Sequence, residues 1–374
     1  MSYKIDFITP HVMGNERKYL NDALDSNWIA PLGPYVKKFE KAIGEYVGAE
    51  AAVAVSSGTA AIHCALVAAG IKPGDKVAVA DLTFIASANP IAYIGAEPVC
   101  IDSEWETFNM DPEALRMAAE RYNLKAVIVP HLYGTPADMK RIREICWEKD
   151  IIIIEDATEA LGSTYEDTYF AGMIGDIGCF SFNGNKIITS SGGGMVVTPY
   201  SDYAEKALHF ATQAKEPVPY YSHDEIGHNY RLSNLCAAIG LAQFETIVER
   251  IALKRKIYSF YQENLNDGIY LLPEPADCFS NRWVSCGVLD KPVAGQLVAY
   301  LADNGIESRR VWYPLHHQKP YVGSPFVFNR CSDYTAADYL FLHGICLPSD
   351  TKMTADDMQF VVDKINTFLK EVGA

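Results

Sequence analysis

Seven short apolar runs, rich in valine and isoleucine, recur along the first part of the chain and are separated by stretches with helical periodicity. The runs are continuous rather than alternating, which is typical of strands covered on both faces in a largely parallel sheet with crossover helices. The last two runs are joined too closely for another crossover helix, so we expect at least one antiparallel strand. The runs cover residues 52–55, 76–79, 98–101, 126–129, 151–154, 179–182 and 194–197.

The pattern changes near residue 243, where long helical stretches replace the alternation of strands and helices. We therefore expect an α/β protein with a large domain over residues 1–245, built on a seven-stranded, mostly parallel sheet, and a smaller α+β domain over residues 246–374. The amino-terminal segment, through about residue 35, is compatible with packing on either domain, and residues 1–15 could pack on the smaller one. In the second part, strands are predicted at 283–289 and 307–312, and helices at 292–304 and at 354–371, the last with a Thr-x-x-Asp capping signal.

Composition limits the partners of this chain. It has 374 residues, 49% of them hydrophobic, and a formal net charge of −15. Nonspecific binding to nucleic acid or anionic lipid requires clustered basic residues, so neither is expected. The nine cysteines are scattered without a C-x-x-C pair, and the nine histidines show no metal-ligand spacing, so we expect free thiols and no metal. The opening segment lacks the apolar core of a signal peptide, and no stretch is long enough to span a bilayer. A soluble cytoplasmic protein is expected.

Two residues point to covalent cofactor chemistry. Lys186 lies between an apolar strand and a glycine run, where its amine would be partly desolvated, and Asp156 ends the apolar run IIIIED. A lysine amine and a carboxylate at strand ends suit pyridoxal 5′-phosphate, because the amine forms a Schiff base and the acid keeps the pyridine nitrogen protonated. Two simpler interpretations stay open, namely that Asp156 caps a helix and that Lys186 is an exposed loop residue.

A possible phosphate site follows the first apolar run. In SSGTAAIH the strand ends at a Gly-Thr turn and a helix begins at once, so the amides of Gly58 and Thr59 could hold a phosphate. Ser181 and Asn229 could add side-chain donors. A plain strand-to-helix turn would give the same pattern. Phe84, which follows another strand end, is either a core residue or a ring-stacking partner.

Candidates for substrate binding come from a basic and aromatic segment, ESRRVWYPLHHQ, which contains Arg309, Arg310, Trp312 and His316. Arg231 is a further candidate, because a guanidinium can bind a diphosphate or a carboxylate with two bonds. A surface strand of mixed composition is the alternative interpretation of the segment.

Taken in order, these motifs resemble a known family. The chain is similar to the nucleotide-sugar aminotransferases of the DegT/DnrJ/EryC1/StrS family, which are fold type I pyridoxal-phosphate enzymes, and the resemblance covers essentially its whole length. It rests on SSGTAAIH, DLTFIASANP, HLYG, EDATEALGS, FSFNGNKIITSSGGGM and GHNYRLSNLCAAIG. Within the family, SNWIAPLGP, FNGNKIITSSGGGM, SNRWVS and RRVWYPLHHQ resemble the UDP-4-amino-4,6-dideoxy-N-acetyl-glucosamine transaminases of the bacillosamine pathway.

The resemblance implies a role for each matching residue. Lys186 would carry the cofactor, Asp156 would pair with its pyridine nitrogen and Phe84 would stack on its ring. Gly58, Thr59 and Ser181 would hold its phosphate.

Two further positions follow from the resemblance. Asn229 would bind the phosphate of the neighbouring subunit's cofactor, in a homodimer whose active sites are shared. Glu159 stands where many relatives have glutamine or histidine beside the phenolic oxygen, and a carboxylate there would repel the phenolate unless it is protonated or turned toward substrate, so its role is open.

The implied reaction is a transamination from L-glutamate to C4 of a UDP-4-keto-6-deoxy-N-acetylhexosamine, with pyridoxamine 5′-phosphate as the intermediate form of the cofactor. A GDP- or dTDP-linked keto sugar of the perosamine type is the alternative, and a noncatalytic ligand sensor with this fold is another. The family's 3-dehydratase branch carries histidine in place of the Schiff-base lysine, and Lys186 argues against it.

Overall fold

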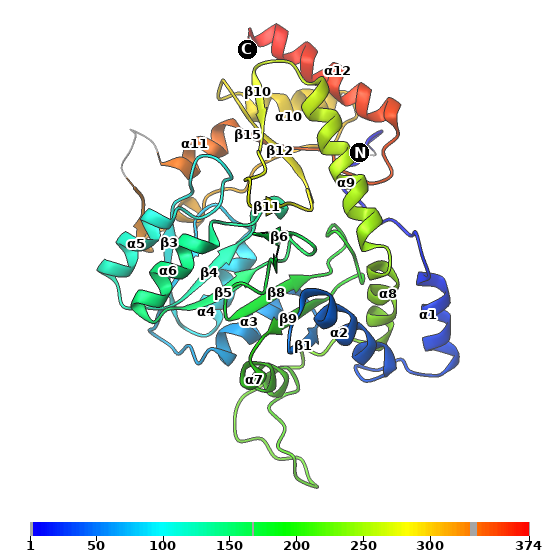
Figure 1. Cartoon of the computed structure of the whole chain (residues 1–374), viewed down its shortest axis with the longest axis vertical. Helices are drawn as coiled ribbons and strands as arrows, with labels where there is room; N and C mark the ends of the chain where they lie inside the picture. The colour runs from blue at the N-terminus through cyan, green and yellow to red at the C-terminus, as the bar shows by residue number, and fades with distance from the viewer. Residues whose placement is uncertain (1–2, 167, 330–334, 374) are drawn as a thin grey trace.

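The computed structural model describes residues 3–166, 168–329 and 335–373 (Figure 1). Its central sheet has eight strands in the order β1-β9-β8-β5-β4-β2-β3-β14. These strands are β1 (Ala51–Val55), β2 (Lys76–Ala80), β3 (Glu97–Ile101), β4 (Leu124–Pro130), β5 (Ile152–Asp156), β8 (Ile177–Ser181), β9 (Gly194–Thr198) and β14 (Phe326–Val327).

All seven predicted strands belong to this sheet, and the predicted antiparallel strand is β9, which runs antiparallel to both β1 and β8. The other neighbouring pairs are parallel. The expectation of seven strands is wrong by one, because β14 pairs with β3 at the far edge. This strand has two residues and comes from the C-terminal part of the chain, so it carries no periodicity of its own.

Helices cover both faces of the central sheet, as the continuous apolar runs predict. Along β1, Val53 and Val55 face one layer of helices and Ala54 faces the other. The first layer consists of α3 (Gly58–Ala68), α4 (Asn89–Tyr93) and α7 (Ser201–Ala211). The second consists of α2 (Pro34–Val47), α5 (Pro112–Arg121), α6 (Met139–Lys149) and α8 (Asn234–Phe244).

A second, antiparallel sheet forms the upper part of the molecule in Figure 1, in the order β10-β12-β15-β13. Ile5 pairs with Ile306 and lies in the apolar core of this part, so the N-terminal segment packs on it. The strands are β10 (Ile269–Leu271), β12 (Ser285–Leu289), β13 (Arg309–Arg310) and β15 (Gly344–Leu347), and the helices of this region are α9 (Ile247–Asn264), α10 (Ala294–Asp303), α11 (Ala336–His343) and α12 (Ala355–Val372).

The ends of these elements follow from local signals. Thr354 and Asp357 form the capping box that the sequence predicts at the start of α12. The predicted strand at 307–312 is shorter in the structure, since only Arg309–Arg310 pairs with β15. We propose the junction between α8 and α9 as the domain boundary, because α9 leads from the central sheet to the second sheet (Figure 1).

A fifth apolar cluster, which includes Phe108, Tyr133, Trp283 and Leu340, lies between the two sheets. None of the helices in the described ranges is both long and apolar enough to cross a membrane. The cytoplasmic location stays a prediction. A third sheet has the strand order β11-β6-β7, and α1 packs on α8. The remaining elements are α1 (Glu16–Asp25), β6 (Thr164–Tyr165), β7 (Tyr169–Phe170), β11 (Cys278–Phe279), η1 (Ile85–Ser87), η2 (Leu132–Gly134) and η3 (Leu315–His317).

Candidate active site

A cavity of about 380 Å³ opens at the carboxyl ends of strands in the central sheet, the place where open α/β sheets usually bind ligands. Side chains from the second sheet and its connections, among them Trp283, close it from the other side. Nine residues predicted from the sequence line this cavity together: Gly58, Thr59, Phe84, Asp156, Glu159, Ser181, Lys186, Arg309 and Trp312.

Asp156 is the last residue of β5, and its carboxylate is held by two donors. Oδ2 accepts a 2.6 Å hydrogen bond from the hydroxyl of Ser87, and Oδ1 accepts a 3.2 Å bond from the backbone amide of Thr158. Thr83 in turn lies 2.8 Å from the Ser87 hydroxyl oxygen. No helix begins at Asp156 in the described structure, so the capping interpretation does not apply. The carboxylate is therefore buried but fixed in orientation, as a group that must face a ligand atom requires.

Lys186 lies in the loop between β8 and β9, and its side chain is only 12% exposed. Its Nζ is 3.5 Å from Oε1 of Glu159 and 4.4 Å from the ring centroid of Trp283. The amine is thus enclosed between a carboxylate and an aromatic face, and the interpretation as a solvated loop lysine does not fit this geometry.

Glu159 faces Lys186 from the segment that follows β5. Its Oε2 accepts a 2.8 Å hydrogen bond from the amide of Tyr133, which has the left-handed φ of 54°. Burial raises the pKa of Glu159 above its ordinary value, although the charge of Lys186 and the Tyr133 amide act in the opposite direction. The carboxyl group is therefore easier to protonate than an exposed glutamate, and it is turned toward the lysine amine.

The start of α3 forms a cradle for an anion. Ser57 caps the helix by accepting a 3.0 Å hydrogen bond from the amide of Ala60, and the first amides of the helix have no partner within it. Gly58 is required here, because a Cβ at this position would lie 2.8 Å from the Cβ of Ser181. Because of this close approach, the first residue of α3 and Ser181 lie side by side and line the same cavity.

An aromatic wall stands on the side of the second sheet. Phe84 and Trp312 are in contact, with ring centroids 5.1 Å apart, and the amide of Trp312 donates a 3.0 Å hydrogen bond to the hydroxyl of Tyr133. Phe84 is 50% exposed, so it is a cavity residue and not a core residue. Two buried polar atoms in this region have no partner among the described residues, namely Nε1 of Trp312 and Oδ1 of Asn185. Such atoms are stabilised when a ligand supplies the missing hydrogen bonds.

Residues predicted from the sequence that lie outside the cavity include Arg231, Asn229 and His316. Arg231 donates hydrogen bonds of 2.6 Å to Glu40 and 2.9 Å to the carbonyl of Ala54, so its guanidinium is already engaged. Asn229 pairs with Thr212 beside α7.

The third, His316, lies near the end of β2. Its Nδ1 is 2.6 Å from Oδ2 of the buried Asp81, and its Nε2 is 3.6 Å from Asp338. His317 lies 2.7 Å from the same oxygen of Asp338, and these three side chains bring potential metal-ligating atoms within 4.8 Å of one another. Carboxylates already face both ring nitrogens of His316. We therefore interpret these contacts as ion pairs that fix the loop carrying Trp312, and not as a metal site.

Four residues that support the site are absent from the set predicted by sequence. Ser87 and Tyr133 lie in the motifs DLTFIASANP and HLYG, so the motif named the segment but not the residue. Asn185 precedes the lysine directly. Trp283 belongs to SNRWVS, about a hundred residues beyond the lysine, and nothing local in the sequence places it in the cavity.

The residues present fit pyridoxal 5′-phosphate. A fixed carboxylate suits the pyridine nitrogen, a buried amine suits the aldehyde carbon, and a helix start with a glycine suits the phosphate. Together with a mostly parallel sheet and a second α+β part, this donor set defines a pyridoxal-phosphate-dependent transferase of fold type I.

Comparison with known proteins agrees with this class. The model of the DegT/DnrJ/EryC1/StrS aminotransferase family matches residues 10–366. The chain is 45% identical over 371 residues to EpsN of Bacillus subtilis (strain 168), assigned as a pyridoxal phosphate-dependent aminotransferase, with 97% of this chain and 95% of EpsN covered. It is 39% identical over 363 residues to a GDP-perosamine synthase of Escherichia coli O157:H7, with 97% and 98% covered.

A solved structure supports the fold. The crystal structure of a DegT DnrJ EryC1 StrS aminotransferase from Brucella abortus is 28% identical, has a TM-score of 0.88 and covers 95% of both chains. The chain therefore belongs to the DegT/DnrJ/EryC1/StrS family and is a pyridoxal-phosphate-dependent sugar aminotransferase. The fold class, the cofactor and the type of reaction predicted from the sequence are confirmed.

Proposed function

We propose that this enzyme transfers the amino group of L-glutamate to C4 of a nucleotide-linked 4-keto-6-deoxy sugar. The observation that carries the proposal is the meeting of the Lys186 amine with the carboxyl groups of Asp156 and Glu159 in one cavity. Arg309 and Trp312 line the same cavity from the second sheet and offer donors to the substrate.

Lys186 and Asp156 have different roles in the proposed proton transfers. Pyridoxal 5′-phosphate, when bound, supplies the electron sink that lets a proton leave the α-carbon of the amino acid. Lys186 would hold the cofactor, and its amine would also be the group that moves this proton, which for a positioned acid or base is worth ~10²–10⁴ in rate. Asp156, fixed by Ser87 and Thr158, would keep the ring nitrogen protonated.

The other cofactor contacts follow the shape of the cavity. The amides of Gly58 and Thr59 with the hydroxyl of Ser181 would hold the phosphate at the start of α3. Phe84, half exposed into the cavity, would offer its aromatic face to the cofactor ring.

Substrate contacts are proposed for two residues of the second sheet and its loop. The Nε1 of Trp312 is buried without a partner in the described structure and can donate to a hydroxyl or carboxylate oxygen. The Arg309 side chain is 55% exposed and pairs with Glu307 at 3.1 Å, so it can move to an anionic group at the mouth. The contacts of Arg231 and His316 favour structural roles for these two residues.

Two nucleotides are candidates. The motifs that resemble the UDP-4-amino-4,6-dideoxy-N-acetyl-glucosamine transaminases favour a UDP-linked N-acetyl sugar, and the relative named GDP-perosamine synthase favours a GDP-linked sugar. The purified enzyme should be incubated with glutamate and UDP-, GDP- and dTDP-linked 4-keto sugars, and each product identified by NMR. Formation of a C4 amine from one of them supports the proposal, and failure with all three contradicts it.

A variant of the lysine tests the proton role. Lys186→Ala should bind the cofactor without a covalent link and bind the sugar nucleotide, but should not complete a turnover. Steady production of 2-oxoglutarate by this variant would contradict the role given to Lys186.

We also propose a homodimer in which Asn229 reaches the cofactor of the neighbouring subunit. Asn229 lies outside the cavity of its own chain, next to an exposed segment with Tyr220, Tyr221 and Ile226, which are 68%, 84% and 87% exposed. Mixing and refolding Lys186→Ala with Asn229→Ala tests this arrangement. If Asn229 acts across the interface, mixed dimers contain one intact site and regain activity. If it acts within its own chain, the mixture stays inactive.

A further inference from the structure

Trp283 is a buried residue at the back of the active site that the proposed reaction does not yet use. Its side chain is 2% exposed, and its ring centroid lies 4.4 Å from Nζ of Lys186. The indole Nε1 donates a 2.7 Å hydrogen bond to the carbonyl of Asn185, the residue before the lysine. The indole therefore contacts both the reactive side chain and the backbone that carries it.

Asn281 fixes the position of Trp283 relative to the central sheet. Its Nδ2 donates 3.0 Å hydrogen bonds to the carbonyls of Glu159 and Leu161, and its Oδ1 accepts a 2.8 Å bond from the amide of Trp283. The asparagine is fully buried, and a Cβ on Gly134 would lie 2.0 Å from its Oδ1. One carboxamide thus ties the Glu159 segment and Trp283 together, so the two partners of the Lys186 amine share one support.

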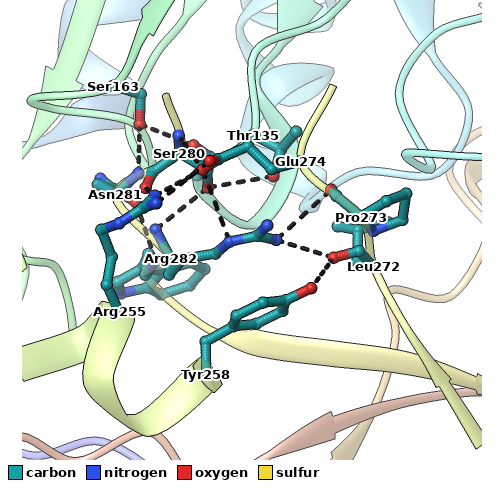
Figure 2. Close-up of polar contacts among 12 residues, drawn as sticks. Thr135, Ser163, Arg255, Tyr258, Leu272, Pro273, Glu274, Ser280, Asn281 and Arg282 are labelled. Carbon is teal, nitrogen blue, oxygen red and sulfur yellow. Dashed lines mark hydrogen bonds and ion pairs between the residues drawn. The ribbon is translucent and has the colours of Figure 1, made fainter. Parts of the chain in front are cut away.

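Arg282, which lies between Asn281 and Trp283, stabilises the turn that these three residues form. Arg282 has a left-handed φ of 52°, which costs a non-glycine residue free energy unless its surroundings compensate. Its guanidinium lies 3.7 Å from the ring centroid of Tyr258 in α9, and Nη1 donates a 2.8 Å bond to the carbonyl of Leu272. Figure 2 shows Arg282 reaching toward Tyr258 and Leu272, away from Asn281 and Ser163. The turn places the arginine on α9 and leaves Trp283 facing the lysine.

We propose that Trp283 is a positioning residue for Lys186, whose aromatic face holds the amine opposite the Glu159 carboxylate. This inference rests on the proton-carrying role proposed for Lys186. A lysine has a flexible four-carbon stem, so an amine freed from the cofactor needs a partner that keeps it near the reacting carbon. An aromatic face attracts the ammonium form through its quadrupole but cannot accept its proton, whereas a second carboxylate could.

Substitutions at position 283 separate the ring face from simple packing. Trp283→Leu should lower the rate of the half-reaction with L-glutamate about tenfold while leaving the KM for glutamate nearly unchanged. The substitution should also slow covalent attachment of added pyridoxal 5′-phosphate to Lys186. Borohydride reduction and peptide mapping at successive times measure this attachment. Trp283→Phe keeps an aromatic face and should recover most of both rates. Trp147→Leu is the matched control, because Trp147 is 90% exposed on α6 and is not among the residues that line the cavity.

A second series keeps the shape of the residue. Tryptophan analogues with one to four ring fluorines, placed at position 283 alone, weaken the negative face of the ring with little change in packing. The rate of the half-reaction with L-glutamate should fall stepwise with fluorine number, because the lysine amine becomes an ammonium ion when it takes up the proton. A rate that is independent of fluorination, or equal losses in Trp283→Leu and Trp283→Phe, would overturn the inference. These readouts require no sugar nucleotide, so they stay informative if the proposed sugar substrate is wrong.

Discussion

The hydroxyl of Ser87 donates a 2.6 Å hydrogen bond to Oδ2 of Asp156, and both side chains are buried. Ser87 is the last residue of η1, in the segment that follows β2, whereas Asp156 ends β5. The bond fixes the rotation of the carboxylate and leaves its other oxygen facing Thr158 and the cavity. Ser87 therefore orients the Asp156 carboxylate but does not line the cavity itself.

Removal of that support should have a moderate effect. Ser87→Ala is expected to lower the half-reaction rate by about three- to tenfold, because one hydrogen bond to a charged group is lost. Asp156→Asn should lower it by ~10² or more, since the amide cannot keep a ring nitrogen protonated. Stopped-flow spectroscopy of the half-reaction measures both. Ser103→Ala is the control, because this buried hydroxyl has no partner among the described residues. Equal rates for Ser87→Ala and the wild type would contradict the prediction.

The close contact at Gly58 predicts a steric effect on cofactor affinity. In Gly58→Ala the new Cβ would meet Ser181 Cβ at 2.8 Å, and one of the two must move. We expect the Kd for pyridoxal 5′-phosphate to rise about tenfold or more, with destabilisation of about 1–3 kcal/mol. Gly44→Ala in α2 meets its nearest atom at 3.6 Å, an ordinary contact, and should leave the affinity unchanged. Titration of the apo enzymes with pyridoxal 5′-phosphate compares the two Kd values. An unchanged Kd for Gly58→Ala would contradict a phosphate site at the start of α3.

Glu159 predicts a pH effect. Burial raises its pKa, so as the pH falls this carboxyl takes up its proton above the ordinary glutamate value of 4.5 and loses its charge facing Lys186. The half-reaction rate of the wild type should fall over this acidic range. Glu159→Gln keeps an acceptor for the Tyr133 amide, so its thermal stability should change little. Its rate should be lower, by about tenfold near neutral pH, and free of that acidic limb. An unchanged acidic limb in Glu159→Gln would assign the titration to another group.

His316 predicts how stability depends on pH. Burial alone would lower its pKa, but the hydrogen bond with Asp81 and the charges of Asp81, Asp338 and Asp102 outweigh it and raise the pKa above 6.5. A raised folded-state pKa stabilises the protein fully below 6.5 and loses this contribution as the pH rises through the folded value.

The difference in Tm between the wild type and His316→Gln should therefore shrink when the pH is raised from about 6 to about 9. His223→Gln, at an exposed histidine, is the control and should follow the wild type throughout. A Tm difference that is constant over this range would show that His316 acts by packing and not by charge.

The sequence by itself determined the strands of the central sheet except β14, and placed Asp156 at a strand end and Lys186 between two strands. Both results depend on local pattern, because a run of valine and isoleucine forms a buried strand wherever it packs and the residue after it faces the ligand edge. The family resemblance supplied the cofactor for the same reason, since its motifs are contiguous segments.

Only the tertiary structure decided which residues surround the lysine amine. Trp283 comes from a segment far from Lys186, and it reaches the cavity because the second sheet packs on the first through Asn281 and its neighbours. The same packing places His316 against Asp81 and pairs β14 with β3. Such contacts join segments that are far apart in the sequence. No local pattern of residues predicts them, because periodicity reports only on neighbouring residues of one helix or strand.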